Sequence, residues 1–364
     1  LQFPISEEDQ DEFPKLRDEF SAKKGTGDLD RVLETLRPAL ESLKGALRRR
    51  YVEPVEWRTK DDWWNHGHSE HVSYTTWSLI LKAAAEFRHQ QGKDDRALEF
   101  ITLGLGLADR VWVKGLGRGG HEGYRIWHTE NALKALSVVL ESHSLEAGQL
   151  DRMSRVLEML EAARPDPVAA LRREDLWDRS ELLDLVEGRS RHGYWRGFPF
   201  YWMTARVAVA DWLPVHDQNQ VLRESVSRLP TWERVQAAAE PARHIRESGT
   251  VVASMMLRPN DAFFWKSVSV DAAQMTLARI AVALARHQLE TGSYPAALSG
   301  LVPRFLPAIP PDPCSGSPFL YLAEADHARV YSLGPDQNDD LGRPNPDGES
   351  DEDGDLVWTV KRRK

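Results

Sequence analysis

Apolar residues recur at steps of three and four between residues 28 and 292, and strict alternation of apolar and polar residues is rare there. This spacing is typical of amphipathic helices, whose apolar stripe must pack against another element. The first stripe follows Asp28 and comprises Leu29, Val32, Leu33, Leu36, Leu40 and Leu43. The sequence therefore predicts that this region is almost wholly helical.

Glycine and proline divide the region into helices joined by short connections. Pro214, for example, is predicted to separate two helices, because proline interrupts the backbone hydrogen bonds of a helix. Short connections favour antiparallel helix pairs, stacked here as an irregular array because no fixed-period repeat is present. The helices after the first are predicted at 74–91, 94–113, 122–142, 146–163, 167–186, 199–212, 217–228 and 231–247.

The pattern changes near residue 268, where a long apolar helix runs to Gly292 and a proline-rich stretch follows. Short runs with aromatic or β-branched residues come next, as expected for a small antiparallel sheet. These strands are predicted at 319–323, 328–333 and 356–360. A helix packed on such a sheet forms an α+β unit.

The predicted fold class is mainly α, with an irregular multi-helical array followed by a small α+β module. At 364 residues, the chain is expected to contain about two domains. We predict an all-helical domain at 1–265 and the α+β module at 266–364.

Composition narrows the classes of function. The 41% hydrophobic and 28% charged residues are ordinary for a soluble chain, and no uncharged apolar run approaches a membrane-spanning length. A net charge of -9 argues against a nucleic-acid partner, because binding to phosphates relies on clustered Lys and Arg. The single cysteine, Cys314, excludes an internal disulfide and a thiolate-built metal site. The chain begins with Leu1, which fits removal of a signal peptide or membrane anchor and fits a trimmed cytosolic chain equally well.

Several ordered motifs distinguish the C-terminal quarter. They are Ala278–Leu284, Gly292-Ser293-Tyr294-Pro295, Pro311-Asp312-Pro313, Gly316-Ser317-Pro318, Tyr331–Asp336 and Gly354–Trp358. Over residues 268–360 this succession resembles the soluble part of the major pseudopilin of type II secretion systems. The preceding helical region resembles that of poorly characterised bacterial envelope proteins, of planctomycete type, that carry such a module. The resemblance implies a periplasmic or extracytoplasmic location, and a precursor with an N-terminal anchor.

One departure from the pseudopilin pattern bears on assembly. Pseudopilins assemble through a hydrophobic helix at the extreme N-terminus, whereas the corresponding helix here is internal and contains Arg279, Arg286 and His287. We therefore expect the module to serve as a compact end domain that does not polymerise.

An acidic stretch precedes the last predicted strand. Nine acidic residues and the single basic residue Arg343 lie between 336 and 355. Acidic runs are usually solvated, but carboxylates on a flexible loop also suit calcium. The spacing is not that of an EF-hand, because Leu341 occupies the position that requires glycine.

The pseudopilin resemblance implies a structural calcium ion in this loop. The positions that match the family's ligands are the Leu333 carbonyl, Asp336, Asp353 and Asp355, and Asp340 is a further candidate. The loop here is longer than the usual one, which leaves the middle carboxylates open.

Two other clusters are candidate sites. His66, His68 and His71 lie close together beside several acidic residues, and imidazoles three apart on a helix turn can share a cation. Their spacing matches no established zinc-site pattern. A polar helix N-terminus is the alternative reading of this cluster. An aromatic stretch is a candidate binding surface, although aromatic clusters are more often packing, and it comprises Tyr194, Trp195, Phe198, Tyr201 and Trp202.

No catalytic motif is visible, so the sequence favours a scaffold or interaction protein with a protein partner over an enzyme. The alternative is a periplasmic metallohydrolase or carbohydrate-active enzyme that uses His66, His68 and His71 with the nearby tryptophans.

Elemental analysis of the purified protein separates these hypotheses. Stoichiometric zinc is expected for the metallohydrolase, whereas calcium without zinc is expected for the scaffold.

Overall fold

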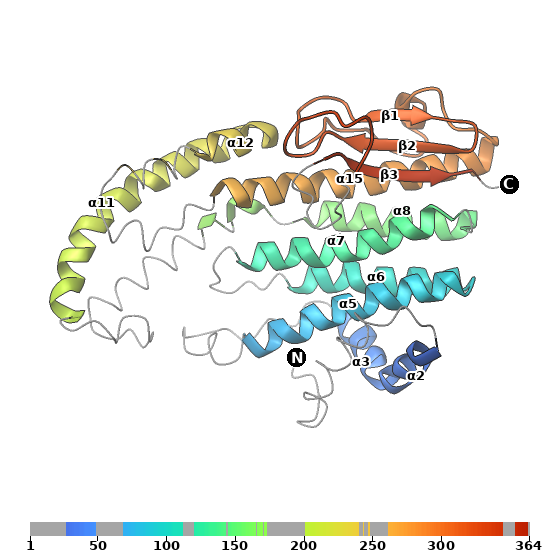
Figure 1. Ribbon diagram of the computed structural model, residues 1–364, viewed down its shortest axis with the longest axis horizontal. Coiled ribbons are helices and arrows are strands. Elements are labelled where there is room, and N and C mark those ends of the chain that lie inside the picture. The colour runs from blue at the N-terminus through green and yellow to red at the C-terminus, as the bar shows by residue number, and fades with distance from the viewer. Residues whose placement is uncertain are drawn as a thin grey trace.

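The structure of the protein, a computed structural model, describes residues 27–48, 68–111, 120–142, 145–164, 166–169, 171–172, 201–239, 243, 247, 261–344 and 354–362. The fold is mainly helical, with a small three-stranded antiparallel sheet near the C-terminus, so the predicted fold class is confirmed (Figure 1).

The helices follow the predicted order closely. They are α2 (Gly27–Thr35), α3 (Arg37–Arg48), α5 (His68–Gln90), α6 (Asp94–Val111), α7 (Gly120–Leu140), α8 (Ala147–Ala162), α11 (Tyr201–Ser227), α12 (Thr231–Ala237) and α15 (Asp261–Thr291). A short 3-10 helix, η2 (Leu298–Leu301), follows α15. The first apolar stripe spans α2 and α3, whose boundary falls at Leu36.

The predicted break at Pro214 is wrong, because this proline lies inside the continuous helix α11. A proline removes one backbone hydrogen bond and crowds the preceding turn. Here Val215 and His216, which follow it, are buried, so packing on this face of α11 favours continuation of the helix. Of the predicted helices at 167–186 and 231–247, most of the first and the end of the second lie outside the described residues.

The sheet consists of β1 (Leu320–Ala323), β2 (His327–Ser332) and β3 (Leu356–Lys361) in the order β1-β2-β3. The three predicted strands are confirmed, and each end lies within one residue of its predicted position. Both neighbouring pairs are antiparallel, and Val330 of β2 lies opposite Trp358 of β3.

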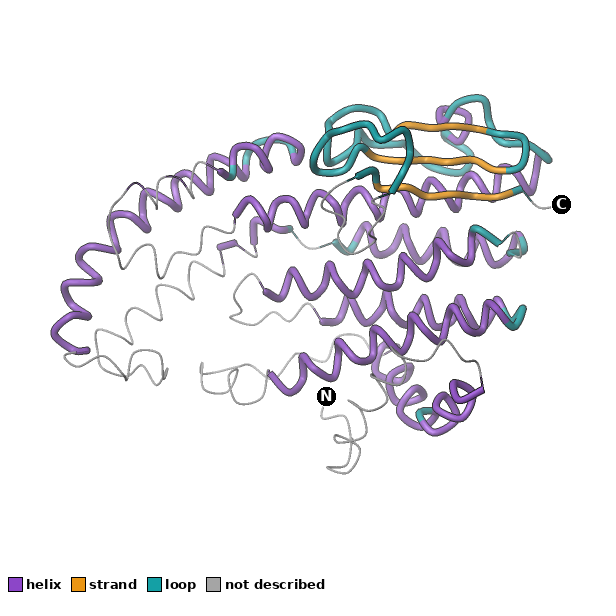
Figure 2. Tube along the Cα trace, in the orientation of Figure 1, coloured by secondary structure: helices purple, strands orange, loops and turns teal. Residues whose placement is uncertain are grey.

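The elements are arranged in layers. Helices α5, α6, α7, α8 and α15 lie roughly side by side, α2 and α3 cover the far edge, and the sheet lies on α15 (Figure 1). The tube view shows α11 extending away from these layers, while α12, which contacts α15, lies next to the loops at one end of the sheet (Figure 2).

Helix α15 contacts α7 and α8 on one side and strands β2 and β3 on the other. Its segment Ala262–Thr291 is long and apolar enough to cross a membrane. An 18-residue window of this segment has a mean hydropathy of 1.4, yet 78% of that window is buried within the protein. Burial to this extent is typical of a helix in a protein core. The indole N–H of Trp358 donates to the Gln274 side chain at 2.8 Å and joins the sheet to α15.

One cluster of buried apolar side chains runs from α2 through the helical layers to β3. Leu136 of α7, Leu277 of α15 and Val330 of β2 all belong to it and are fully buried. Helix α15 itself begins before residue 265 and crosses the expected boundary between the two domains. The division into two domains at residue 265 stays a prediction. Apolar residues before and after this position belong to the same core.

Replacing Leu277 by Ala should therefore destabilise the helices and the sheet together, by about 2–5 kcal/mol, because a large buried side chain is lost. Urea unfolding followed by circular dichroism, with hydrogen exchange of the β2 amides, measures both effects. Met159→Ala is the control, because Met159 is 63% exposed and its loss should change stability by less than about 0.5 kcal/mol. Unchanged exchange in β2 of Leu277→Ala would contradict a shared core.

Candidate functional site

The acidic loop leaves β2 at Leu333 and returns to the sheet at Asp355, directly before β3. Among the predicted ligand positions, Asp336 is exposed, Leu333 and Asp340 are half-buried, and Asp355 is buried. Asp353 lies outside the described residues. The structure thus places the two ends of the predicted site next to one another.

Backbone contacts close the loop. The Gly354 N–H donates to Asp336 Oδ2 at 3.4 Å, and the Asp355 N–H donates to the Arg343 carbonyl at 3.2 Å. Gly334 has a φ of 71°, and a Cβ atom there would lie only 2.6 Å from the Gly354 carbonyl oxygen. Glycine is required at this position for both reasons.

The Asp355 carboxylate sits inside this closure and is only 3% exposed. Its Oδ2 accepts the Gly342 N–H at 2.7 Å, whereas its Oδ1 is buried and has no hydrogen-bond partner in the part of the chain that the structure describes. Burial raises the pKa of Asp355, and the negative charges of Asp339 and Asp340 raise it further against the opposing effect of the Gly342 N–H. An unpaired buried carboxylate oxygen is costly, and a cation beside it would remove that cost.

Carboxylate and carbonyl oxygens are the ligands that calcium prefers. Asp336 and Asp355 lie at the two ends of the closed loop, with Asp340 between them in sequence, so their oxygens suit a hard cation. The described contacts join the first part of the loop, up to Arg343, to Gly354 and Asp355, but they do not fix the identity of an ion. The predicted calcium site therefore stays a prediction.

The carboxylate of Asp312, which is 1% exposed, organises the start of the loop and had no assigned role in the sequence. It accepts hydrogen bonds from Ser315 Oγ at 2.9 Å, Ser332 Oγ at 2.8 Å and the Cys314 N–H at 3.0 Å. Ser332 Oγ in turn accepts the Gly334 N–H at 3.1 Å. The only sequence signal for this role is an acidic residue held between two prolines.

A second acidic group, also absent from the sequence predictions, lies at the β1–β2 hairpin. Ligand atoms of Glu324, Asp326 and His327 all lie within 4.8 Å of one another. These side chains already pair internally, with His327 Nδ1 2.8 Å from Asp326 Oδ1, and Arg329 donates to Glu324 at 3.1 Å. We interpret the group as the ion pairs of an exposed hairpin.

The histidine cluster and the aromatic surface fall largely outside the described residues. His66 lies before the described part of α5, while His68 and His71 are in its first turns without described side chains. Tyr194, Trp195 and Phe198 precede α11, and Tyr201 and Trp202 begin it, again without described side chains. Both candidate sites stay predictions.

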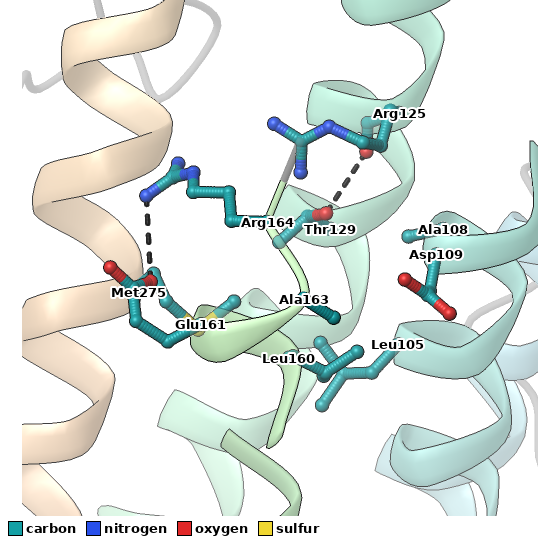
Figure 3. Close-up of a pocket in the computed structure, with 10 residues that line it drawn as sticks. All are labelled: Leu105, Ala108, Asp109, Arg125, Thr129, Leu160, Glu161, Ala163, Arg164 and Met275. Atoms are coloured by element: carbon teal, nitrogen blue, oxygen red, sulfur yellow. Dashed lines mark hydrogen bonds and ion pairs between the residues drawn. The ribbon is translucent and has the colours of Figure 1, made fainter. Parts of the chain in front are cut away.

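A pocket of about 110 Å³ lies among α6, α7, the end of α8 and α15 (Figure 3). Apolar side chains line part of it, and Arg125, Glu161 and Arg164 supply most of its charge. Arg164 Nη1 lies 3.5 Å from Glu161 Oε2, so these lining groups are partly paired with each other.

Asp271 of α15, which is 4% exposed, anchors the two arginines of this pocket. Its Oδ2 accepts a hydrogen bond from Arg125 Nη2 at 2.7 Å and another from Arg164 Nη2. Burial alone would raise the pKa of Asp271, but the positive charges of Arg164 and Arg125 bring it below its ordinary value. Since the arginines are bound by an internal carboxylate, we assign this network to the joining of α7 and α8 to α15.

Comparison of the chain with protein-family models, curated proteins and solved structures finds no match in any of the three.

Asp271→Asn should destabilise the protein by about 3–5 kcal/mol, because two largely buried guanidinium groups lose their shared anion. Since the folded-state pKa of Asp271 is lowered, its contribution is present above the unfolded-state pKa of about 3.9 and is lost as pH falls through the folded-state value. Urea unfolding between pH 2 and pH 7 measures both effects.

Asp95→Asn is the matched control, because the Asp95–Arg152 pair is exposed and should contribute less than about 1 kcal/mol. Equal losses in the free energy of unfolding for the two variants would show that burial does not increase the contribution of the Asp271 network to stability.

Proposed function

We propose that this protein is a non-catalytic scaffold or interaction protein of the bacterial cell envelope, with a calcium-stabilised, pseudopilin-like C-terminal module. The observation that carries the proposal is the buried Oδ1 of Asp355, which has no hydrogen-bond partner among the described residues and lies where Asp336 and Gly354 close the loop. A solvated acidic tail would leave its carboxylates in water, where no cation is needed. Burial of this one favours a bound cation.

Calcium suits the donor set better than zinc, because the candidate ligands Leu333, Asp336, Asp340, Asp353 and Asp355 all offer oxygen atoms. When bound, the ion would supply positive charge to the loop. Asp336 and Asp355 would then be joined across the closure that the Gly354 N–H already makes. An affinity of about 0.1–1 mM would suffice in an extracytoplasmic compartment.

A non-polymerising role agrees with the packing of α15. A helix that assembles a fibre must offer its apolar face to other copies of the chain. In this protein α7, α8 and the sheet already cover α15. The proposal therefore treats the module as an end domain fixed to the helical layers, with membrane attachment only through an N-terminal anchor of the precursor.

The proposed partner is a protein. The net charge of -9 disfavours the phosphate backbone of nucleic acid, and α11 extends away from the layered helices (Figure 1). The metallohydrolase alternative has no support from the described residues, since His66 lies outside them and the side chains of His68 and His71 are not described.

Calcium should raise the Tm of the protein, and EDTA should lower it, because a ligand that binds only the native state stabilises it. At 10–100 times the Kd the gain is about 1.4–2.7 kcal/mol. Asp355→Asn should abolish this response. Without calcium the same variant should melt about 2–4 °C higher than the unmodified protein at pH 7, because it removes a buried negative charge near Asp339 and Asp340.

The sign of this second effect follows from the raised pKa of Asp355. A carboxyl whose pKa is raised by folding favours the folded state below its unfolded-state pKa, and that benefit is lost as pH rises through the folded-state value. Asp326→Asn, in the exposed hairpin group, is the control and should keep the calcium response. An unchanged Tm with calcium and with EDTA would refute the proposed site.

A further inference from the structure

The tip of the helical arm, here α11 and α12 together, rests on a turn of the C-terminal module. The turn spans residues 312–317, and its Gly316 has a φ of 73°. A Cβ atom at Gly316 would lie 2.7 Å from the indole ring of Trp232 in α12, so the ring lies directly against the glycine. Figure 2 shows α12 beside the loops at this end of the sheet.

The same turn is bound to the acidic loop by two routes. Gln337, which has a positive φ of 58°, donates through Nε2 to the Cys314 carbonyl at 2.9 Å. Through the second route, Asp312 holds Ser332, whose Oγ accepts the Gly334 N–H where the loop begins. The Gly316 N–H donates to the Asp312 carbonyl at 2.7 Å, so Gly316, against which Trp232 lies, belongs to this hydrogen-bond network.

Hydrogen bonds, neighbouring positions in the chain and one packing contact therefore connect the acidic loop to the arm. Asp336 accepts the Gly354 N–H, and the neighbouring Gln337 donates to the Cys314 carbonyl. Gly316, two residues after Cys314, lies against the ring of Trp232. A ligand that orders Asp336 also restricts Gln337, because the two residues are adjacent in the chain.

We propose that cation binding at the acidic loop and docking of α12 on the 312–317 turn are coupled, so that the occupied loop holds the arm against the C-terminal module. This inference rests on the proposed calcium site and adds a consequence for the arm. Coupling between two sites is reciprocal, so docking of α12 also raises the affinity of the loop for the cation.

Helix α12 has a second attachment that the loop does not control. Arg234 lies 4.6 Å over the ring of Trp265 in α15, and Ala238, which follows α12, is fully buried. Loss of the Gly316 contact should therefore loosen α12 without releasing it. We expect a change of severalfold in the readouts below, and no unfolding of the arm.

Calcium titration of the full chain, with hydrogen exchange of residues 230–239, tests the coupling. Saturating calcium should slow exchange of these amides on the order of fivefold in the unmodified protein. Trp232→Ala should weaken calcium binding by a similar factor, although Trp232 is not a candidate ligand. Trp232→Phe, which keeps a ring against Gly316, should retain most of the affinity.

Gln337→Ala should leave calcium binding measurable and remove the effect of calcium on exchange at residues 230–239, because it cuts the route to Cys314. Gln236→Ala, on the exposed side of α12, is the control and should behave as the unmodified protein. Circular dichroism and Tm of each variant show whether it is folded.

The outcomes distinguish the two proposals. No calcium binding to the unmodified protein at 5 mM refutes the calcium site, and with it the coupling. Calcium binding with unchanged exchange at residues 230–239, and with the same affinity in Trp232→Ala, retains the site and overturns the coupling.

Discussion

The apolar residues of α15 are buried from two directions, by α7 and α8 on one side and by the sheet on the other. Neither partner alone could bury the helix, because it is apolar around most of its circumference. The sheet has only three short strands, and it buries its apolar face by packing against α15. Joint burial on α15 therefore holds the helical layers and the C-terminal module in one core.

Polar contacts fix how α15 sits within this core. Asp271 accepts hydrogen bonds from Arg125 and Arg164, and Gln274 accepts the Trp358 indole N–H on the side of the sheet. These two residues of α15 are three positions apart and face different partners. Apolar burial supplies most of the stability, while the directional bonds select one rotation of the helix.

The acidic loop depends on this arrangement, since β2 and β3 present its two ends at neighbouring positions in the sheet. Closure brings like charges together, and the buried Asp355 meets the charges of Asp339 and Asp340. Backbone donors such as the Gly342 N–H offset only part of that repulsion. A bound cation would offset the remaining repulsion between these carboxylates.

Periodicity predicted the helices and strands well, because it reports which face of each element is buried. It failed at Pro214, where burial of the residues after the proline outweighs one lost hydrogen bond. The acidic loop was visible as composition, but composition does not show which carboxylate is buried. Contacts between distant segments, such as Trp232 on Gly316 and Asp271 with Arg164, leave no local pattern in a single sequence.

A crystal structure of the protein grown with calcium, using anomalous scattering to locate the ion, tests the central claim most directly. The account predicts an anomalous peak about 2.3–2.6 Å from Asp355 Oδ1, with Asp336 oxygens in the same coordination shell. A well-ordered loop in which Asp355 Oδ1 faces only protein atoms or water, with no peak nearby, would contradict it.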